Sequence, residues 1–231
     1  MQNLTNFEFF PTCIQGILVE NPSQSPACEN QADLDYMNAL SMSILFYEAQ
    51  MAGPLPDWHR VPWRGDSTML DGCNLGIDLS GGFFDAGDHL KFTYPMSFSM
   101  NVLIWGMLEF GAGYQQAGEW QNSLNIVKHG LDYLKNAHHA PNRLIAQVGF
   151  TPNDHQWWGR PEELATDRLT IYELNSTHPG ADVFGQVAAT FASGALLYKN
   201  IAKGSHFYPR SRLNLKIETN CAIMIHFRTL N

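Results

Sequence analysis

The sequence lacks several features that define whole classes of protein. It contains no low-complexity stretch and no long run of charge, so we expect no extensive disorder. No apolar run approaches the roughly eighteen residues that span a bilayer, so no transmembrane helix and no membrane partner are expected. Its four cysteines are widely spaced and form no Cys-x-x-Cys pair, so a zinc or redox motif of that kind is not supported.

Basic residues are also scarce. The 231 residues include 14 Lys and Arg against 22 Asp and Glu, which gives a formal net charge of −8. Nucleic-acid-binding proteins need a basic face, so this balance argues against a nucleic-acid partner and favours a neutral ligand. The charge is uneven, because residues 201–231 carry +4 and residues 1–200 carry −12. A shift of this kind suggests that the last segment has a different origin.

Four segments show the apolar spacing of helices. Apolar residues recur every three or four positions over about 33–52, 97–110, 119–137 and 181–199. We expect Ser97 to cap the second of these helices and Gly111 to end it. The fourth is rich in small residues that permit close helix packing.

Two long connections separate these segments. Residues 53–96 are rich in Gly, Pro and aromatic residues, and residues 139–180 contain one candidate strand, 144–148. Loops this long inside a compact domain are usually functional. The pattern predicts an all-α fold of stacked helical hairpins, with the site on the face formed by the loops.

The first connection carries two carboxylates three residues apart. Asp85 and Asp88 lie in a turn rich in small residues, followed directly by His89. Two carboxylates at this spacing can be aimed at one water molecule, which becomes a nucleophile when one of them takes its proton. An isolated Asp-x-x-Asp is more often a cap or a turn, because Asp readily forms both.

The second connection combines polar and aromatic side chains over residues 154–162. His155, Trp157, Trp158 and Arg160 make a candidate ligand-facing surface, since Trp rings offer flat apolar faces to the C–H faces of a sugar. Each alone has a plainer interpretation, as a structural histidine or as core aromatics. Arg160 and Glu162 are expected to brace the loop, because Arg–carboxylate pairs are common supports.

Several long motifs in order closely resemble glycoside hydrolase family 9, the cellulases of plants, bacteria and invertebrates. The resemblance covers about residues 33–200 and rests on the helix at 39–50, Val61 to Ser67, Asp78 to His89, Gln147 to Gly149, Asp154 to Glu162, and His178 to Asp182 with the Ala-rich helix after it.

This resemblance implies a fold, an activity and a set of site residues. The fold is an (α/α)6 barrel of helical hairpins. The activity is endo-hydrolysis of β-1,4-glucan with inversion, with Asp88 as the general base and Asp85 holding the same water. His155 and Trp158 would contact glucose units, and His89 is assigned with them. No cofactor is implied, although a structural calcium ion, not placed here, occurs in some members. Location would be extracellular, although Glu8, Pro11 and Gln15 interrupt the N-terminal apolar stretch and make it a poor secretory signal.

The family pattern is incomplete in this sequence. The family's general acid is a Glu near the end of a longer catalytic domain, and nothing after Asn200 resembles that domain. We therefore expect an N-terminal segment (1–32), a partial catalytic domain (33–200) and an unrelated basic tail (201–231). The expected protein is a truncated member that folds poorly or lacks activity alone. Glu218 is not assigned the role of the acid.

Two alternatives remain open at this point. The first is a β-glucan-binding protein that retains the base loop and the aromatic residues but does not catalyse hydrolysis. The second is a metal hydrolase that uses Asp85, Asp88, His89, Asp154 and His155 as ligands, since carboxylate and imidazole sets suit several ions.

Overall fold

The computed structural model describes residues 35–164 and 167–204. The chain divides into two units, Met1–Asp35 and Tyr36–Asn231, and the description below concerns the second. The expected N-terminal segment 1–32 lies outside the described residues, as does the expected basic tail from residue 205 onward.

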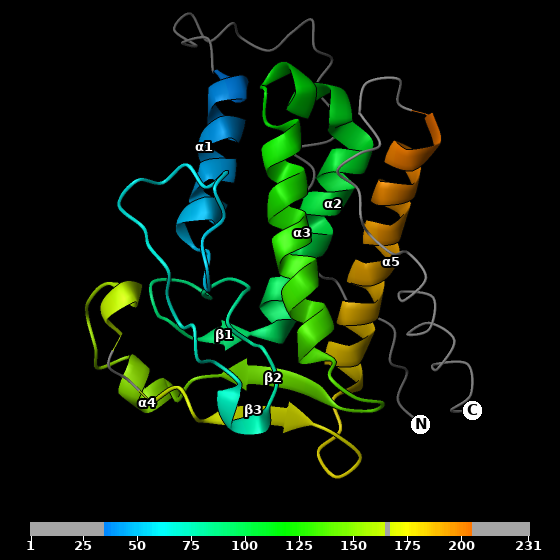
Figure 1. Cartoon of the computed structure of the whole chain (residues 1–231). Helices are drawn as coiled ribbons and strands as arrows, with labels where there is room; N and C mark the ends of the chain where they lie inside the picture. The colour runs from blue at the N-terminus through cyan, green and yellow to red at the C-terminus, as the bar shows by residue number, and fades with distance from the viewer. Residues whose placement is uncertain (1–34, 165–166, 205–231) are drawn as a thin grey trace, which may run out of the picture. The chain divides into compact units, whose positions relative to one another are not determined.

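Four long helices stand side by side in this unit, and a small sheet lies at one end of them (Figure 1). The helices are α1 (Tyr36–Ala49), α2 (Thr93–Gln116), α3 (Trp120–Ala137) and α5 (Ala181–Gly204). They match the four segments predicted from apolar spacing. No helix among the described residues is both long and apolar enough to cross a bilayer.

Two details of α2 differ from the prediction. Ser97 does not cap the helix, because α2 begins at Thr93 and the hydroxyl of Ser97 donates to the carbonyl of Tyr94 within the helix. Gly111 does not end it either. The backbone departs from helical angles at Phe110 (φ −116°, ψ 30°), and the helix then continues to Gln116. The prediction therefore placed a stop where the structure has a kink.

The core lies between α2, α3 and α5. Met100, Ile104 and Met107 of α2 pack with Leu131 of α3 and Phe191 of α5, and all five are buried. The small residues of α5 permit close approach, since a Cβ added at Gly194 would lie 3.0 Å from Leu131 Cδ1. Polar contacts reinforce the same interface: Ser193 Oγ donates to Asn101 Oδ1 (2.6 Å) and Thr190 Oγ1 donates to the Ser97 carbonyl (2.8 Å).

The sheet is a feature that the all-α prediction largely omitted. It has three antiparallel strands in the order β1 (Lys91–Phe92), β2 (Leu144–Val148) and β3 (Ile171–Leu174). Only β2 was predicted, because strands of two and four residues are too short to show a clear alternation. Short helical turns complete the loops: 3-10 turns at Cys73–Leu75 and Pro161–Glu163, and α4 (Thr151–Asp154). The fold is mainly helical with this small sheet.

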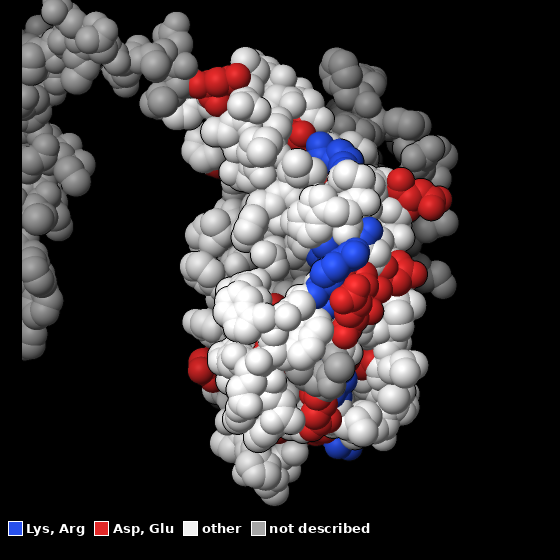
Figure 2. Space-filling view, turned by 90° about the vertical axis from the view of Figure 1, so that its left-hand side faces the viewer, with Lys and Arg blue, Asp and Glu red and all other residues white. Residues whose placement is uncertain are grey.

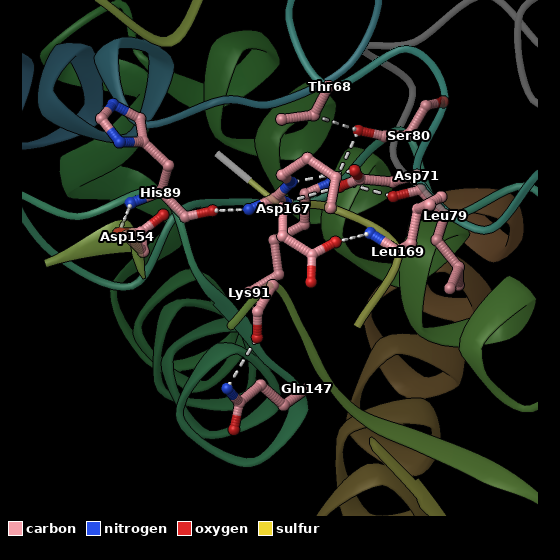
Figure 3. A network of polar contacts seen from close by, with 12 residues as sticks. Thr68, Asp71, Leu79, Ser80, His89, Lys91, Gln147, Asp154, Asp167 and Leu169 are labelled. Atoms are coloured by element: carbon pink, nitrogen blue, oxygen red, sulfur yellow. Dashed lines mark hydrogen bonds and ion pairs between the residues drawn. The ribbon is translucent and has the colours of Figure 1, made fainter. Parts of the chain in front are cut away.

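A buried ionic cluster joins the sheet to the first long loop (Figure 3). The ammonium group of Lys91, which is fully buried, lies 2.8 Å from Asp71 Oδ2 and donates to the carbonyls of Leu79 and Ser80, both at 2.7 Å. Arg168 pairs with the same carboxylate at 2.6 Å. Burial lowers the pKa of Lys91 to about 8, and the Asp71 carboxylate opposes that shift.

We expect Lys91→Met to reduce the free energy of unfolding by about 3–5 kcal/mol, because removal of one partner of a buried ion pair leaves unpaired polar groups in the interior. The matched control is Lys128→Met, since Lys128 makes an exposed i,i+4 pair with Asp132 that is worth at most about 1 kcal/mol. Urea unfolding of the two variants checks this, and equal losses would contradict it.

Candidate active site

The loop that carries Asp85 and Asp88 is closed by backbone hydrogen bonds at its base. The N–H of Phe84 donates to the Gln50 carbonyl (3.0 Å), and the N–H of Asp85 donates to the Leu90 carbonyl (2.9 Å). Residue 82 must be glycine here: its φ is +83°, and a Cβ would lie 2.8 Å from the ring of Tyr133 on α3. The residues between Asp85 and Leu90 therefore form a tight loop held close to the helices.

Asp88 contacts the second long loop. The Nε2 of His155 lies 3.0 Å from Asp88 Oδ2, and the pair joins residues that are 67 positions apart in the sequence. Asp88 Oδ1 is buried and accepts no hydrogen bond from the described residues, so one oxygen of this carboxylate keeps its acceptor capacity. The structure thus brings together Asp88 and His155, which the sequence predicted to share a site.

Asp85 lies close enough to Asp88 for the two charges to interact. The pKa of Asp85 is raised, first by burial and then by the neighbouring Asp88 carboxylate. Its side chain also lines a hollow between α1 and α2, together with Tyr47, Phe84 and Met96. A carboxylate with a raised pKa beside a second carboxylate is an arrangement suited to proton transfer.

His89 occupies a different position from the one expected of a sugar contact. Its side chain is buried, with a relative exposure of 7% for the residue, and the ring packs edge-on against Phe84 and Trp157, with centroid distances of 5.3 Å to each. The backbone N–H of His89 donates to Asp154 Oδ1 (3.0 Å). Burial is the main cause of its lowered pKa. The imidazole of His89 thus contacts one aromatic ring from each of the two long loops.

Trp158 is the most prominent side chain of the second loop. It is 90% exposed, whereas the neighbouring Trp157 packs against His89. The loop beneath it is braced as predicted: Glu162 accepts hydrogen bonds from Arg64 Nε (2.9 Å) and the Gly65 N–H (2.8 Å). Arg160 donates to the Trp63 carbonyl at 3.0 Å. The structure therefore presents an open indole face on a fixed loop.

Some of the side chains considered as metal ligands lie within reach of one ion. Within the described part of the chain, one set could hold an ion: Asp88, Asp154 and His155 each offer an atom within 4.8 Å of the others. Asp85 and His89 do not belong to that set. The structure thus joins three of the five residues considered from the sequence.

Two residues for which no role was predicted from the sequence, Arg168 and Lys91, bind the main chain on either side of the Asp85–Asp88 turn. Arg168 donates to the His89 carbonyl through Nη1 (2.6 Å), and Lys91 binds the segment before the loop through Leu79 and Ser80. Arg168 lies 79 positions from His89, and nothing in its local sequence marks it. The one signal in the sequence is that Arg168 lies within the long connection 139–180, which is predicted to be functional because of its length.

Comparison with known families identifies the family of this chain. The model of glycosyl hydrolase family 9 matches residues 36–206, which include both long loops and all four long helices. The chain belongs to glycosyl hydrolase family 9. The match extends past Asn200, as does α5, which ends at Gly204.

Relatives from plants share 43% identity with this family 9 chain. They include Endoglucanase 22 of Oryza sativa subsp. japonica, over 72% of this chain and 30% of the relative, and Endoglucanase 19 of Arabidopsis thaliana, over 71% and 26%. The chain therefore spans 26–38% of the length of such plant relatives.

Solved structures show the same fold. An endoglucanase from the termite Nasutitermes takasagoensis has a TM-score of 0.74 at 36% identity, covering 85% of this chain and 42% of the termite chain. The cellulase Cel9M of C. cellulolyticum, solved in complex with cellobiose, has a TM-score of 0.73 at 31% identity, covering 84% and 43%.

The coupling between the two loop carboxylates can be tested directly. In Asp88→Asn, the pKa of Asp85 should fall because the neighbouring negative charge is gone, yet stay above its usual range because burial remains. Carboxyl ¹³C NMR titration measures the pKa of Asp85, and Asp132→Asn, which removes an exposed carboxylate of α3, is the control. An unchanged pKa of Asp85 in Asp88→Asn would show that the charges do not interact.

Proposed function

We propose that this chain carries the general-base side of an inverting endo-β-1,4-glucanase site, with Asp88 as the base. The observation that carries the proposal is the pairing of the Asp85–Asp88 loop with His155, which belongs to the same loop as the exposed Trp158, inside the region matched by family 9. The face drawn in Figure 2 is mostly uncharged, and acidic and basic side chains adjoin on it. That surface suits a neutral polysaccharide.

The proposed reaction is a single displacement. Asp88 takes a proton from a water molecule, which attacks the anomeric carbon on the face opposite the leaving oxygen. Asp85 accepts the second hydrogen of that water and orients it. The glycosidic C–O bond breaks, and a protonated carboxyl group about 6.5–9.5 Å from the base supplies a proton to the leaving oxygen. Water and three carboxyl groups supply all the chemistry, so the reaction needs no cofactor.

The proposed substrate is a β-1,4-glucan. Support comes from the Cel9M complex with cellobiose and from the endoglucanase relatives. In this chain Trp158 would stack on a glucose ring, and His155 would bind a hydroxyl group beside the cleavage point. An insoluble polymer is met outside the cell, so we place the working enzyme there.

The proposed site is completed by further parts of the family domain. We assign no general acid among the described residues, and the chain spans 26–38% of the length of such plant relatives. Large apolar side chains are exposed on α1 and α2, among them Phe46, Trp105 and Phe110. We propose that the remaining helices of an (α/α)6 barrel cover such faces, and that this chain alone hydrolyses polysaccharide poorly.

A substrate that needs no general acid tests the base alone. Fluoride leaves without a proton, so we expect the chain to hydrolyse β-cellobiosyl fluoride and to release the α-anomer of cellobiose. Asp88→Asn should lower kcat by about 10²–10⁴, the usual contribution of a general base. Asp132→Asn is the control. Hydrolysis that is unaffected by Asp88→Asn, or release of the β-anomer, would refute the assignment.

Binding can be tested without turnover. Trp158→Ala should weaken the binding of cellotetraose about tenfold, because a stacked aromatic face is lost. Trp105→Ala is the matched control, since it removes an exposed indole from α2 instead of the loop. Calorimetric titration measures both, and equal effects of the two variants would count against a sugar site at Trp158.

The second candidate function is β-glucan binding without hydrolysis. The 90% exposure of Trp158 favours it, because an open indole binds a sugar ring with or without a complete catalytic site. Binding of cellotetraose with no release of fluoride from β-cellobiosyl fluoride would select this alternative.

A further inference from the structure

The main chain of His89 is held on both sides by the second long loop. Its N–H donates to Asp154 Oδ1 (3.0 Å), and its carbonyl accepts a hydrogen bond from Arg168 Nη1 (2.6 Å). Figure 3 shows His89 and Asp154 side by side. The first contact fixes the peptide group that joins Asp88 to His89. The orientation of that peptide sets the direction in which the Asp88 side chain leaves the backbone.

Arg168 is itself fixed by a two-point ion pair. Its Nε donates to Asp71 Oδ1 (3.0 Å) and its Nη2 donates to Asp71 Oδ2 (2.6 Å). The guanidinium group is planar, so these two bonds also fix the direction of the remaining Nη1 donor. That donor points at the carbonyl of His89. The side chain of Asp71 is fully buried. Through Arg168, it therefore fixes the position of the His89 carbonyl.

The same carboxylate holds the segment before the loop. Lys91 pairs with Asp71 Oδ2 and uses its other hydrogens on the carbonyls of Leu79 and Ser80. One buried anion is thus connected, through two cations, to residues on both sides of the Asp85–Asp88 turn. The loop is held from both of its ends.

Space for Arg168 depends on the absence of a side chain at residue 149. Gly149 has a φ of +98°, and a Cβ there would lie 2.7 Å from Arg168 Nη1 and 2.9 Å from Leu90 Cδ2. The first of these atoms is the donor of the hydrogen bond to the His89 carbonyl. A glycine at this position allows the guanidinium group to reach the His89 carbonyl.

We infer that Arg168 is a positioning residue for Asp88, acting through the His89 carbonyl, and that Asp154 is its counterpart at the His89 N–H. The inference rests on the proposed role of Asp88 as the base. Neither residue needs to touch the substrate. Their effect is to fix the loop so that the Asp88 carboxylate is already aimed when the water arrives.

The variant Arg168→Lys separates positioning from fold. Lysine keeps a positive charge beside Asp71, but a single ammonium group cannot reproduce the planar fork that reaches both Asp71 and His89. The matched control is Arg143→Lys, because Arg143 makes a similar two-point pair with Glu173 (2.6 and 2.8 Å) at the far end of β2.

The first measurement is amide hydrogen exchange by NMR on the full chain. Arg168→Lys should raise the exchange rates of the Asp85 and His89 amides about tenfold to hundredfold, the loss of a hydrogen bond to a charged group. Amides of α3 should be unchanged, and Arg143→Lys should leave the loop as in the wild type. Equal loop exchange in the two lysine variants would overturn the inference.

A second pair of variants covers the case in which Arg168→Lys does not fold. Asp154→Ala removes the acceptor of the His89 N–H and leaves the Asp71 cluster intact, so it should raise exchange at Asp85 as well. Asp154→Asn keeps an oxygen acceptor and should restore wild-type exchange. If Asp154→Ala leaves the exchange rate of the Asp85 amide unchanged, the inference that Asp154 fixes the Asp85–Asp88 loop is refuted.

Turnover of β-cellobiosyl fluoride then separates this inference from the proposed function. Arg168→Lys should lower kcat about tenfold or more, while the Kd for cellotetraose stays within about threefold of the wild type. A wild-type kcat in Arg168→Lys would refute the inference. If the wild-type chain does not hydrolyse the fluoride, the proposed function fails, and hydrogen exchange alone decides whether Arg168 holds the loop.

Discussion

The described loops depend most on the ion pairs that the Asp71 carboxylate makes. The carboxylate is buried, and it is shared by Lys91 of the sheet and Arg168 of the second loop. A buried carboxylate is stable only when it is paired and its oxygens are hydrogen-bonded. Here two cations meet that need, and both also donate to main-chain carbonyls. The charge of one side chain thereby organises three segments that are distant in the sequence.

This arrangement explains why the loops are ordered although they contain little regular structure. The four helices supply much of the apolar core, and the first loop adds buried apolar side chains of its own, among them Leu79, Phe83 and Leu90. Polar contacts add to this apolar packing in the loops. Examples are Glu162 with Arg64 and Gly65, and Asp154 with His89. The site is built mainly from such directed contacts, which hold groups at defined angles better than apolar packing does.

The sequence predicted the helices well because their apolar spacing is a local property. It also predicted that Asp88 and His155 share a site, through motifs that resemble a known family. It misplaced the start of α2, since Thr93 to Met96 follow directly on a two-residue strand that has no recognisable pattern. The burial of His89 and the role of Arg168 could not be predicted, because each depends on partners that lie 65 to 97 positions away.

Two consecutive residues of the second loop, Asp154 and His155, contact two consecutive residues of the first loop in the reverse order, His89 and Asp88. Asp154 binds the main chain of His89, and His155, the next residue, binds the side chain of Asp88, the residue before. Surface loops normally tolerate gain or loss of a residue during evolution. In this pair of loops, a single insertion between Gly149 and Asp154 would displace both contacts together. We therefore expect the length of this loop segment to vary less among natural sequences than its composition.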